Sequence, residues 1–333
     1  MITLASLNDI DEIMMFIHHN WKNDHILSKN KTFFKYEHQN KNKLNFIIAK
    51  DNNKITGVLG FISTSTIDIS NVFTVIWKVE ENNGNPVLGI QLLKYLEKLN
   101  EVKNVFSVGI NKNTLQIFKF LNIYTNKLNQ FVLINEKIKK FKIATVSKTK
   151  LKTIEPNKHS DYLSVKKICN ENDLDSFDFE KYKFNLPYKS KDYFIKRYFN
   201  HPIYNYDVYG VCEGKKIVSL YVTRLQPYNN SNVIRIVDFI GDENAMYSFS
   251  KYISKLIVSE GYEYADFYCF GLDDKIIFDS GFEIVKADND DLIIPNYFQP
   301  FEKKNVSIYF FANTKKLEKI NLFKGDGDQD RPS

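Results

Sequence analysis

The sequence predicts a mixed α/β (α+β) protein made of two tandem domains, each with a mixed, mostly antiparallel sheet flanked by helices. An apolar, β-branched run at 72–79 is followed by a turn rich in Asn, Gly and Pro and then by leucines at helical spacing. Paired apolar runs around polar turns indicate β-hairpins. The order of elements in residues 1–135 returns in outline in the second half.

Composition limits the classes of protein that this chain can be. Its 333 residues suit two domains, and 43% hydrophobic content with 27 Phe and 20 Tyr is ample for two cores. The net charge of +6 is modest and spread out, which argues against a nucleic-acid partner. No apolar run has the length of a membrane span, and the N-terminus has no basic segment of a signal peptide, so we expect a cytoplasmic protein without a membrane partner.

The three cysteines are far apart and odd in number, which favours free thiols in a reducing compartment. Their spacing, and that of the histidines, predicts no metal site. The cysteines are Cys169, Cys212 and Cys269.

The first half opens with a strand at 2–5 and a helix capped by Asn8 or Asp9. Further elements are expected in this order: a hairpin of 44–49 and 55–63, a strand at 72–79, a helix from Pro86 to about Leu99, a strand at 105–110, a helix at 111–121, and Val132–Ile134 as the strand that closes the first sheet. Pro86 suits the first helical turn, where its missing N–H costs nothing.

The segment from Trp77 to Leu96 combines a strand, a Gly-containing turn and a helix start. Such an arrangement leaves several backbone N–H groups directed at one place, which favours an anion such as a phosphate. An ordinary strand–turn–helix connection is the alternative.

The helix reading Gly89-Ile-Gln-Leu-Leu-Lys-Tyr-Leu96 and the turn before it resemble the acyl-CoA pyrophosphate motif of the GNAT (GCN5-related) N-acyltransferases. The family pattern is Gln/Arg-x-x-Gly-x-Gly/Ala. Gly89 falls on the last glycine, whereas Val87 stands at the first and no Arg or Gln precedes the turn. The resemblance covers about residues 1–135 and implies acetyl-CoA, or another acyl-CoA, as cofactor. The cofactor-binding residues that it implies are Trp77, Val79, Gly84, Asn85, Val87, Leu88, Gly89 and Asn111.

Acyl transfer to an amine needs a base, and the candidates for that catalytic role are His25, His201 and Asp238, with His38 as a further candidate base. Asp238 lies inside the apolar strand 236–240, where an acid is either buried with a raised pKa or faces outward. Phe118 stands where the family often has a Tyr that acts as general acid, so that role is vacant or filled elsewhere.

The segment 18–39 corresponds to the family's acceptor-covering region, although an amphipathic helix with solvent-facing imidazoles is the alternative. Candidate acceptor-binding residues are His38, Tyr204, Arg331 and Asp328.

We expect an acyl-CoA-binding domain at 1–145 and a degenerate GNAT-like domain at 146–333 that helps to form the acceptor site. The Lys-rich stretch 135–153 is interpreted as the junction. Val165–Asn170 is expected to be part of a helix. Asp242 and Glu243 follow the strand that corresponds to 72–79, and because two carboxylates repel a pyrophosphate, the second half should have lost the cofactor site.

The C-terminal segment 324–333 has aspartates at alternate positions, but it is too short for a calcium loop. It is either a frayed polar tail or a tail that folds over the cleft and grips the acceptor through Arg331 or an aspartate.

Long two-domain GNAT-like proteins resemble enzymes of bacterial surface-polysaccharide synthesis that acylate nucleotide-linked amino sugars. The resemblance therefore implies an N-acetyltransferase with a small-molecule acceptor of that kind, and a second copy of the chain as a candidate partner. Two alternatives remain at this point. One is a tandem-GNAT peptidyl transferase that uses aminoacyl-tRNA, and the other is a GNAT-like binding protein without catalysis.

Overall fold

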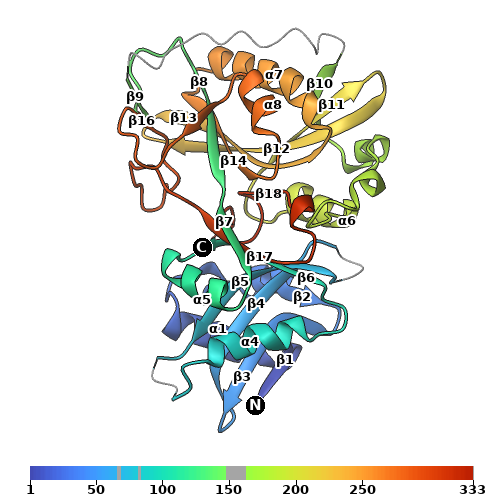
Figure 1. The fold of residues 1–333 in the computed structure, drawn as a ribbon, viewed down its shortest axis with the longest axis vertical. Helices are drawn as coiled ribbons and strands as arrows, with labels where there is room; N and C mark the ends of the chain where they lie inside the picture. Colours follow the sequence, from blue (N-terminus) through green and yellow to red (C-terminus); the bar gives the residue numbers. More distant parts are fainter. Residues whose placement is uncertain (66–68, 82–83, 148–162, 333) are drawn as a thin grey trace.

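The computed structural model describes residues 1–65, 69–81, 84–147 and 163–332 and arranges them in two α/β halves, one above the other in Figure 1. Within the described residues each half is built on an eight-stranded sheet. Both sheets are mostly antiparallel, with a parallel pair in each, and helices flank them. The predicted fold class is confirmed.

The first sheet has the strand order β1-β3-β4-β5-β6-β17-β7, and the short β2 pairs with β3. Its strands are β1 (Ile2–Ser6), β2 (Gln39–Asn40), β3 (Lys43–Asp51), β4 (Lys54–Ser63), β5 (Asn71–Val79), β6 (Asn104–Ile110), β7 (Tyr124–Lys127) and β17 (Tyr309–Asn313). The predicted hairpin is β3–β4, and its turn residues Asn52 and Asn53 have positive φ, which asparagine tolerates.

Alternation along β3 separates the two faces of the first sheet. Phe46 and Ile48 pack under one group of helices, whereas Ile47 and Ala49 pack under the other. The first group is α1 (Ile10–Asn20), α2 (Ile26–Lys29) and α3 (Lys31–His38); the second is α4 (Leu88–Glu97) and α5 (Leu115–Phe120). The predicted helices at the start of the chain and after Pro86 correspond to α1 and α4.

The second sheet has the order β10-β11-β12-β13-β14-β8-β15, and β18 pairs with β14. Its strands are β8 (Asn129–Ile134), β10 (Ser164–Ile168), β11 (Asp207–Glu213), β12 (Lys216–Tyr228), β13 (Ser231–Gly241), β14 (Tyr264–Phe270), β15 (Glu283–Val285) and β18 (Leu322–Phe323). A small separate sheet pairs β9 (Thr145–Val146) with β16 (Leu292–Ile293).

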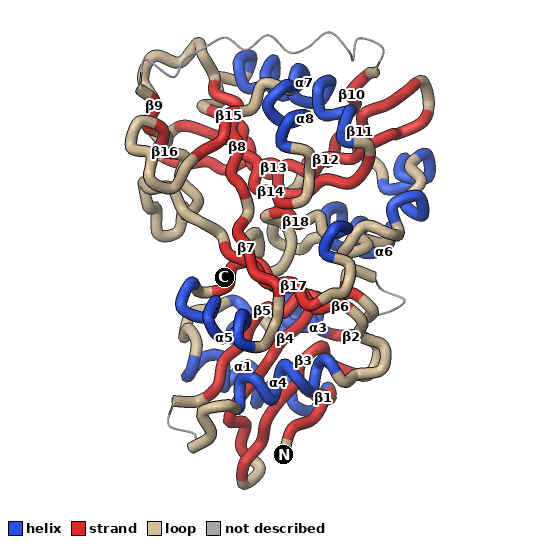
Figure 2. Tube along the Cα trace, viewed as in Figure 1, coloured by secondary structure: helices blue, strands red, loops and turns tan. Residues whose placement is uncertain are grey.

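Helices also cover both faces of the second sheet. Figure 2 shows α7 (Met246–Ser259) and α8 (Asp274–Asp279) together over one face, with α6 (Lys191–Phe194) on the other side. A π-helical turn, η7 (Ile195–Phe199), continues α6. Phe249 of α7 and Phe194 of α6 are both fully buried, in separate core clusters.

The two halves exchange strands. β8 follows β7 directly in sequence, yet β7 belongs to the first sheet and β8 pairs with β14 of the second. In return, β17 from the end of the chain pairs with β6 and β7 of the first sheet. The prediction that Val132–Ile134 closes the first sheet is therefore wrong, and a boundary at 145/146 does not separate the strands of the two sheets.

One further expectation differs from the structure. Val165–Asn170 is not helical, since Ser164–Ile168 forms β10 at the edge of the second sheet. The part of the Lys-rich stretch before 148, interpreted as a junction, exposes its lysines but packs on the second half: Ile143 is fully buried, and the Glu263 carboxylate accepts hydrogen bonds from the N–H groups of Lys142, Ile143 and Ala144. Residues 148–153 of that stretch lie outside the described residues.

The halves share a hydrophobic core. Phe73 and Phe106 of the first sheet, Tyr268 of the second and the exchanged Phe310 belong to one buried cluster. This common core fixes the two sheets against each other, so side chains from both can form one site. In the part of the chain that the structure describes, no helix has the length and apolar character needed to cross a membrane.

Candidate functional site

The first sheet opens between two parallel strands. β5 and β6 pair only at their first residues, from Asn71 beside Asn104 to Phe73 beside Phe106. Beyond that point no backbone pairing joins these two described strands. A cavity of about 630 Å³ lies where they part, and we call it the splay cavity.

The splay cavity is lined by β5, β6, the start of α4, one side of α5 and the C-terminal tail. Its lining residues are Trp21, Thr74, Val75, Trp77, Lys78, Val79, Glu80, Glu81, Pro86, Gly89, Ile90, Ser107, Val108, Gly109, Ile110, Asn111, Thr114, Ile117, Phe118, Leu121 and Asp328.

Aromatic rings form one wall of the splay cavity. The ring of Phe118 lies 6.0 Å from that of Trp77 and 4.5 Å from that of Phe311. Phe118 thus belongs to the apolar wall. The buried Thr74 hydroxyl, also in the lining, has no hydrogen-bond partner among the described residues. A long, mainly apolar ligand with a few polar atoms fits such a lining.

Four of the eight predicted cofactor residues line the splay cavity: Trp77, Val79, Gly89 and Asn111. The other four do not. Leu88 is buried in the core beneath α4, whereas Gly84, Asn85 and Val87 form the turn that leads into this helix. The Asn85 side chain accepts a hydrogen bond from the Val87 N–H at 3.2 Å, which orders the turn.

Gly89 brings the first turn of α4 close to the aromatic wall. A Cβ atom at this position would lie 3.3 Å from Nε1 of Trp77, which is closer than ordinary packing allows. Further along the same face of α4, Leu92, Leu93 and Leu96 are fully buried and hold the helix on the sheet. The start of α4 is therefore fixed against the lining of the cavity.

The C-terminal tail, residues 324–332, crosses from the second sheet to the first. Figure 1 shows β18 and the segment after it between the two sheets. The Gly325 N–H donates to the Val237 carbonyl of β13 at 2.6 Å. At Gly327, which has φ +62°, a Cβ would lie 3.2 Å from the Val108 nitrogen of β6. Only glycine fits this crossing comfortably, because both the close approach and the positive φ exclude a side chain.

Asp328 is the point at which the tail reaches the splay cavity. The same residue also lines a much smaller space of about 10 Å³, which holds no more than about one water molecule. Burial raises the pKa of the Asp328 carboxyl, and the nearby Arg331 opposes this effect. We call this space the small cavity; its lining is His25, Leu27, Phe33, Glu37, His38, Ile62, Val75, Asp328, Arg331 and Pro332.

His25 and His38 both line the small cavity, so the structure brings these two predicted residues together with Asp328 and Arg331. His25 caps α2, since its Nδ1 accepts the Leu27 N–H at 3.2 Å. Burial lowers the pKa of His25 to about 4 and that of His38 to about 3. Both imidazoles are therefore neutral near pH 7.

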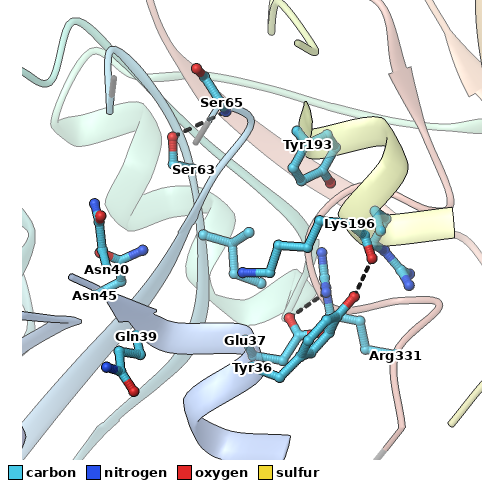
Figure 3. Close-up of a pocket in the computed structure, with 12 residues that line it drawn as sticks. Tyr36, Glu37, Gln39, Asn40, Asn45, Ser63, Ser65, Tyr193, Lys196 and Arg331 are labelled. Atoms are coloured by element: carbon cyan, nitrogen blue, oxygen red, sulfur yellow. Dashed lines mark hydrogen bonds and ion pairs between the residues drawn. The ribbon is translucent and has the colours of Figure 1, made fainter. Parts of the chain in front are cut away.

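A third space lies between the halves, and we call it the interface pocket. Its volume is about 90 Å³, and its lining comes from α3, β2, β3 and β4 of the first half, from α6 and η7 of the second, and from the tail (Figure 3). The lining residues are Tyr36, Glu37, Gln39, Asn40, Asn45, Ile62, Ser63, Ser65, Tyr193, Lys196, Arg197 and Arg331.

A buried ion pair separates the interface pocket from the small cavity. The Arg331 guanidinium donates to the Glu37 carboxylate, and both residues line both spaces. Arg331 is held in turn by the Gly327 carbonyl, which accepts from its Nε at 2.6 Å. The predicted grip of Arg331 is thus made on the protein itself, and it positions the tail.

His201 and Tyr204 lie beside this ion pair in a cluster of aromatic rings. Nδ1 of His201 accepts the N–H groups of Ile203 and Tyr204, and its ring stacks on that of Tyr204 at 5.6 Å. Burial lowers the pKa of His201 to about 3, so its Nε2, 3.9 Å from Glu37, carries no charge. The Arg224 guanidinium lies over the Tyr204 ring, 4.5 Å from the ring centre.

Asp238 lies apart from these spaces, in the second sheet. It accepts hydrogen bonds from Lys189 and from the Tyr198 hydroxyl, and Asp326 of the tail is 2.8 Å from the same Lys189. Burial alone would lower the pKa of Lys189, but the two carboxylates outweigh it and raise that pKa. Asp238 is thus part of a buried ionic network.

The tail fills the opening of the second sheet that corresponds to the splay cavity. β13 and β14 pair only from Ile234 to Ile236, after which β18 and Gly325 occupy the space between them. The chain itself thus takes the place that a cofactor arm would need.

Sequence reasoning missed Glu37, Lys196, Tyr36 and Tyr193, which line the interface pocket. Glu37 and Tyr36 stand beside His38 in the segment already expected to cover the acceptor, so that segment was the available signal. Tyr193 and Lys196 lie in α6 and η7 of the second half, and nothing in their spacing indicates a site. Only the packing of the two halves brings them to α3.

No family model and no curated protein sequence matches this chain. Solved structures do share its fold. A GCN5-related N-acetyltransferase from Anabaena variabilis ATCC 29413 aligns with a TM-score of 0.58 and 9% identity over 94% of this chain and 72% of its own. A protein from Enterococcus faecalis V583, described as a probable N-acyltransferase, aligns with a TM-score of 0.57 and 9% identity over 96% of this chain and 73% of its own. At these identities the likeness shows the fold.

Proposed function

We propose that this protein is an N-acyltransferase that takes its acyl group from an acyl-CoA, with acetyl-CoA as the first candidate. The observation that carries the proposal is the splay cavity, whose lining includes Asp328. The fold shared with solved N-acetyltransferase structures supports the same activity.

The lining of the splay cavity suits an acyl-CoA. The unpaired parts of β5 and β6 offer backbone groups to the amide-containing arm, Trp77 and Phe118 offer apolar contact, and the buried Thr74 hydroxyl has a free hydrogen-bonding position. The turn before α4 and the N–H groups of its first turn would hold the pyrophosphate. When bound, the cofactor supplies an acyl group already activated as a thioester.

Asp328 is suited to act as the base in this reaction. An amine arrives as an ammonium ion and must lose a proton before its nitrogen can attack the acyl carbon. The Asp328 carboxylate, which lines the cavity, can take that proton, and Arg331 favours its charged form. His25 and His38 are neutral neighbours. As the amine nitrogen bonds to the acyl carbon and the carbon–sulfur bond breaks, Asp328 would pass its proton to the leaving thiolate and then take the second proton of that nitrogen, which it releases to solvent. Protonated Asp328 is the only acid that this step needs, which is consistent with Phe118, a residue that has no proton to donate.

The acceptor that we propose is an amino sugar, in its nucleotide-linked form. The interface pocket supports it, because amide and hydroxyl side chains line it from both halves, and such groups suit a hydroxyl-rich ligand.

Thermal unfolding with acetyl-CoA tests the proposed cofactor. At a ligand concentration of about 100 Kd, binding to the folded state alone should stabilise the protein by about 2.7 kcal/mol. Gly89→Glu should remove this shift, because the new side chain would meet Trp77 and its charge would oppose the pyrophosphate.

The matched control is Asn100→Glu, which adds the same charge on an exposed residue beyond the other end of α4. This variant should keep the shift. If neither acetyl-CoA nor longer acyl-CoAs stabilise the wild type, the proposal is wrong, and aminoacyl-tRNA then becomes the acyl donor to test. If the shift occurs without acyl transfer to any amino sugar, the protein binds the cofactor without this activity.

A further inference from the structure

Lys196 places a cation in the interface pocket. Figure 3 shows its side chain reaching from η7 toward the side of the pocket where Asn40 and Asn45 lie. Among the described residues no carboxylate lies within ion-pairing distance of its Nζ, which instead lies 5.1 Å from the centre of the Tyr36 ring. Burial lowers the pKa of this ammonium group; Glu37 opposes that effect and Arg331 adds to it, so a further, bound anion would favour its charged form.

The other charged side chains that line the pocket already have partners within the protein. Arg331 pairs with Glu37, the single carboxylate in the lining. Arg197 donates to the Tyr206 hydroxyl and to the Asp330 carbonyl. The lining thus has three cations for one carboxylate, and Lys196 is the cation that is left.

A second donor stands in the same wall. Tyr193 is buried, its hydroxyl has no hydrogen-bond partner among the described residues, and it lines the pocket with Lys196. Burial raises the pKa of this hydroxyl, so it keeps its proton and can donate. A buried donor without a partner beside an unpaired ammonium group is the arrangement that an anionic oxygen would complete.

We propose that the interface pocket binds an anionic oxygen group of the acceptor, a carboxylate or a phosphate, through Lys196 and Tyr193. This inference rests on the proposed function and narrows its acceptor to an amine that also carries such a group. A volume of about 90 Å³ suits one carboxylate or phosphate with part of the adjoining molecule. Because Glu37 and Arg331 line both this pocket and the small cavity, the acceptor would be anchored on one side of the ion pair while Asp328 stands on the other.

The test is thermal unfolding of the full chain in inorganic phosphate, in acetate and in glucosamine, each compared with chloride at the same ionic strength. We expect phosphate or acetate to raise the melting temperature and glucosamine, which has no anionic group, to have no effect. Phosphate alone would indicate a phosphorylated acceptor, and acetate alone a carboxylated one. Lys196→Met should weaken the effective anion by about tenfold in Kd or more, as expected for loss of a charged hydrogen bond.

Lys183→Met, which removes a charge from an exposed lysine of the same half, should leave the anion effect unchanged. Tyr193→Phe, which only deletes the hydroxyl, should also weaken it and provides a second variant if Lys196→Met folds poorly. The inference is overturned if no anion stabilises the wild type, or if both pocket variants respond as the wild type does. The acetyl-CoA shift is measured separately, so its presence or loss reports on the proposed function alone.

Discussion

Asp328 is a single carboxyl that belongs to two spaces at once. It lines the splay cavity and forms part of the small cavity with His25 and His38. Since these imidazoles have lowered pKa values and Arg331 is paired with Glu37, Asp328 is the group of this cluster best placed to take a proton from an amine.

Asp328→Asn should therefore lower kcat by about 10²- to 10⁴-fold, the usual contribution of a general base. Acetyl-CoA should still stabilise the variant as it does the wild type. The rate of the wild type should fall as the pH drops through the raised pKa of Asp328, because the protonated carboxyl cannot accept the proton. In the variant this acidic limb should be absent. Steady-state kinetics over a pH range, with thermal shifts as the binding control, would check both points; an unchanged kcat would exclude this role.

The sequence indicates Asp328, Arg331 and three histidines as candidate site residues, but it does not predict their hydrogen-bond and ion-pair partners. His25 and His201 each use Nδ1 to accept backbone N–H groups of the turn that follows. This local role is set by backbone geometry and leaves no spacing signal. Asp238 was correctly suspected of burial, yet its partner Lys189 is distant in sequence, and so its pairing could not be predicted.

The tail acts as an element although it has little regular structure. Asp326 meets Lys189 of the second half, whereas Asp330 receives two hydrogen bonds from Arg224 and lies beside Arg197. Burial alone would raise the pKa of Asp330, but Arg224 and Arg197 outweigh it and hold that pKa well below its usual value. Asp326 and Asp330 of the tail thus form ion pairs with cations of the second half.

Asp330→Asn should destabilise the protein by about 3–5 kcal/mol, because it leaves two buried guanidinium groups without their carboxylate. The sign of the pH effect follows from the depressed pKa: the stabilisation is complete above the unfolded value of about 3.9 and is lost as the pH falls through the folded value. Urea unfolding at neutral and acidic pH would measure this. Asp51→Asn, at an exposed carboxylate of the β3–β4 turn, should cost less than about 0.5 kcal/mol. Equal losses in the two variants would contradict the account.

Elements were easier to predict than their partners. Hairpins and amphipathic helices follow from local periodicity, and β3–β4, α1 and α4 appear where the sequence indicates them. The helix predicted at β10 was wrong because Val165 and Ile168 have helical spacing. The segment is instead an edge strand whose lysines are exposed. The sequence correctly indicated a strand at Val132–Ile134, but which sheet it joins depends on pairing with β14, more than a hundred residues later.

At the scale of the whole molecule, the exchanged strands tie the halves together. β17 lies between β6 and β7, so the first sheet is interrupted without the last part of the chain. β8 lies between β14 and β15, so the second sheet depends equally on the first part. The shared core around Phe73 and Tyr268 adds to this dependence.

Fragments 1–147 and 163–333 should therefore fail to fold alone, since each lacks an interior strand of its sheet and carries one that belongs to the other. Produced together, they should associate, elute as one species and recover the acetyl-CoA shift. Size-exclusion chromatography and circular dichroism of the fragments, alone and together, would show this. Cooperative unfolding of fragment 1–147 by itself, with a shift on adding acetyl-CoA, would show that the exchange is dispensable.

The exchange also constrains how such a protein can change during evolution. The repeated order of elements would otherwise invite recombination between the halves, as happens with independent modules. Here a genetic crossover between β8 and β10 would give each product a strand without a sheet and a sheet with a gap. The two halves must therefore be inherited, and must diverge, as one unit.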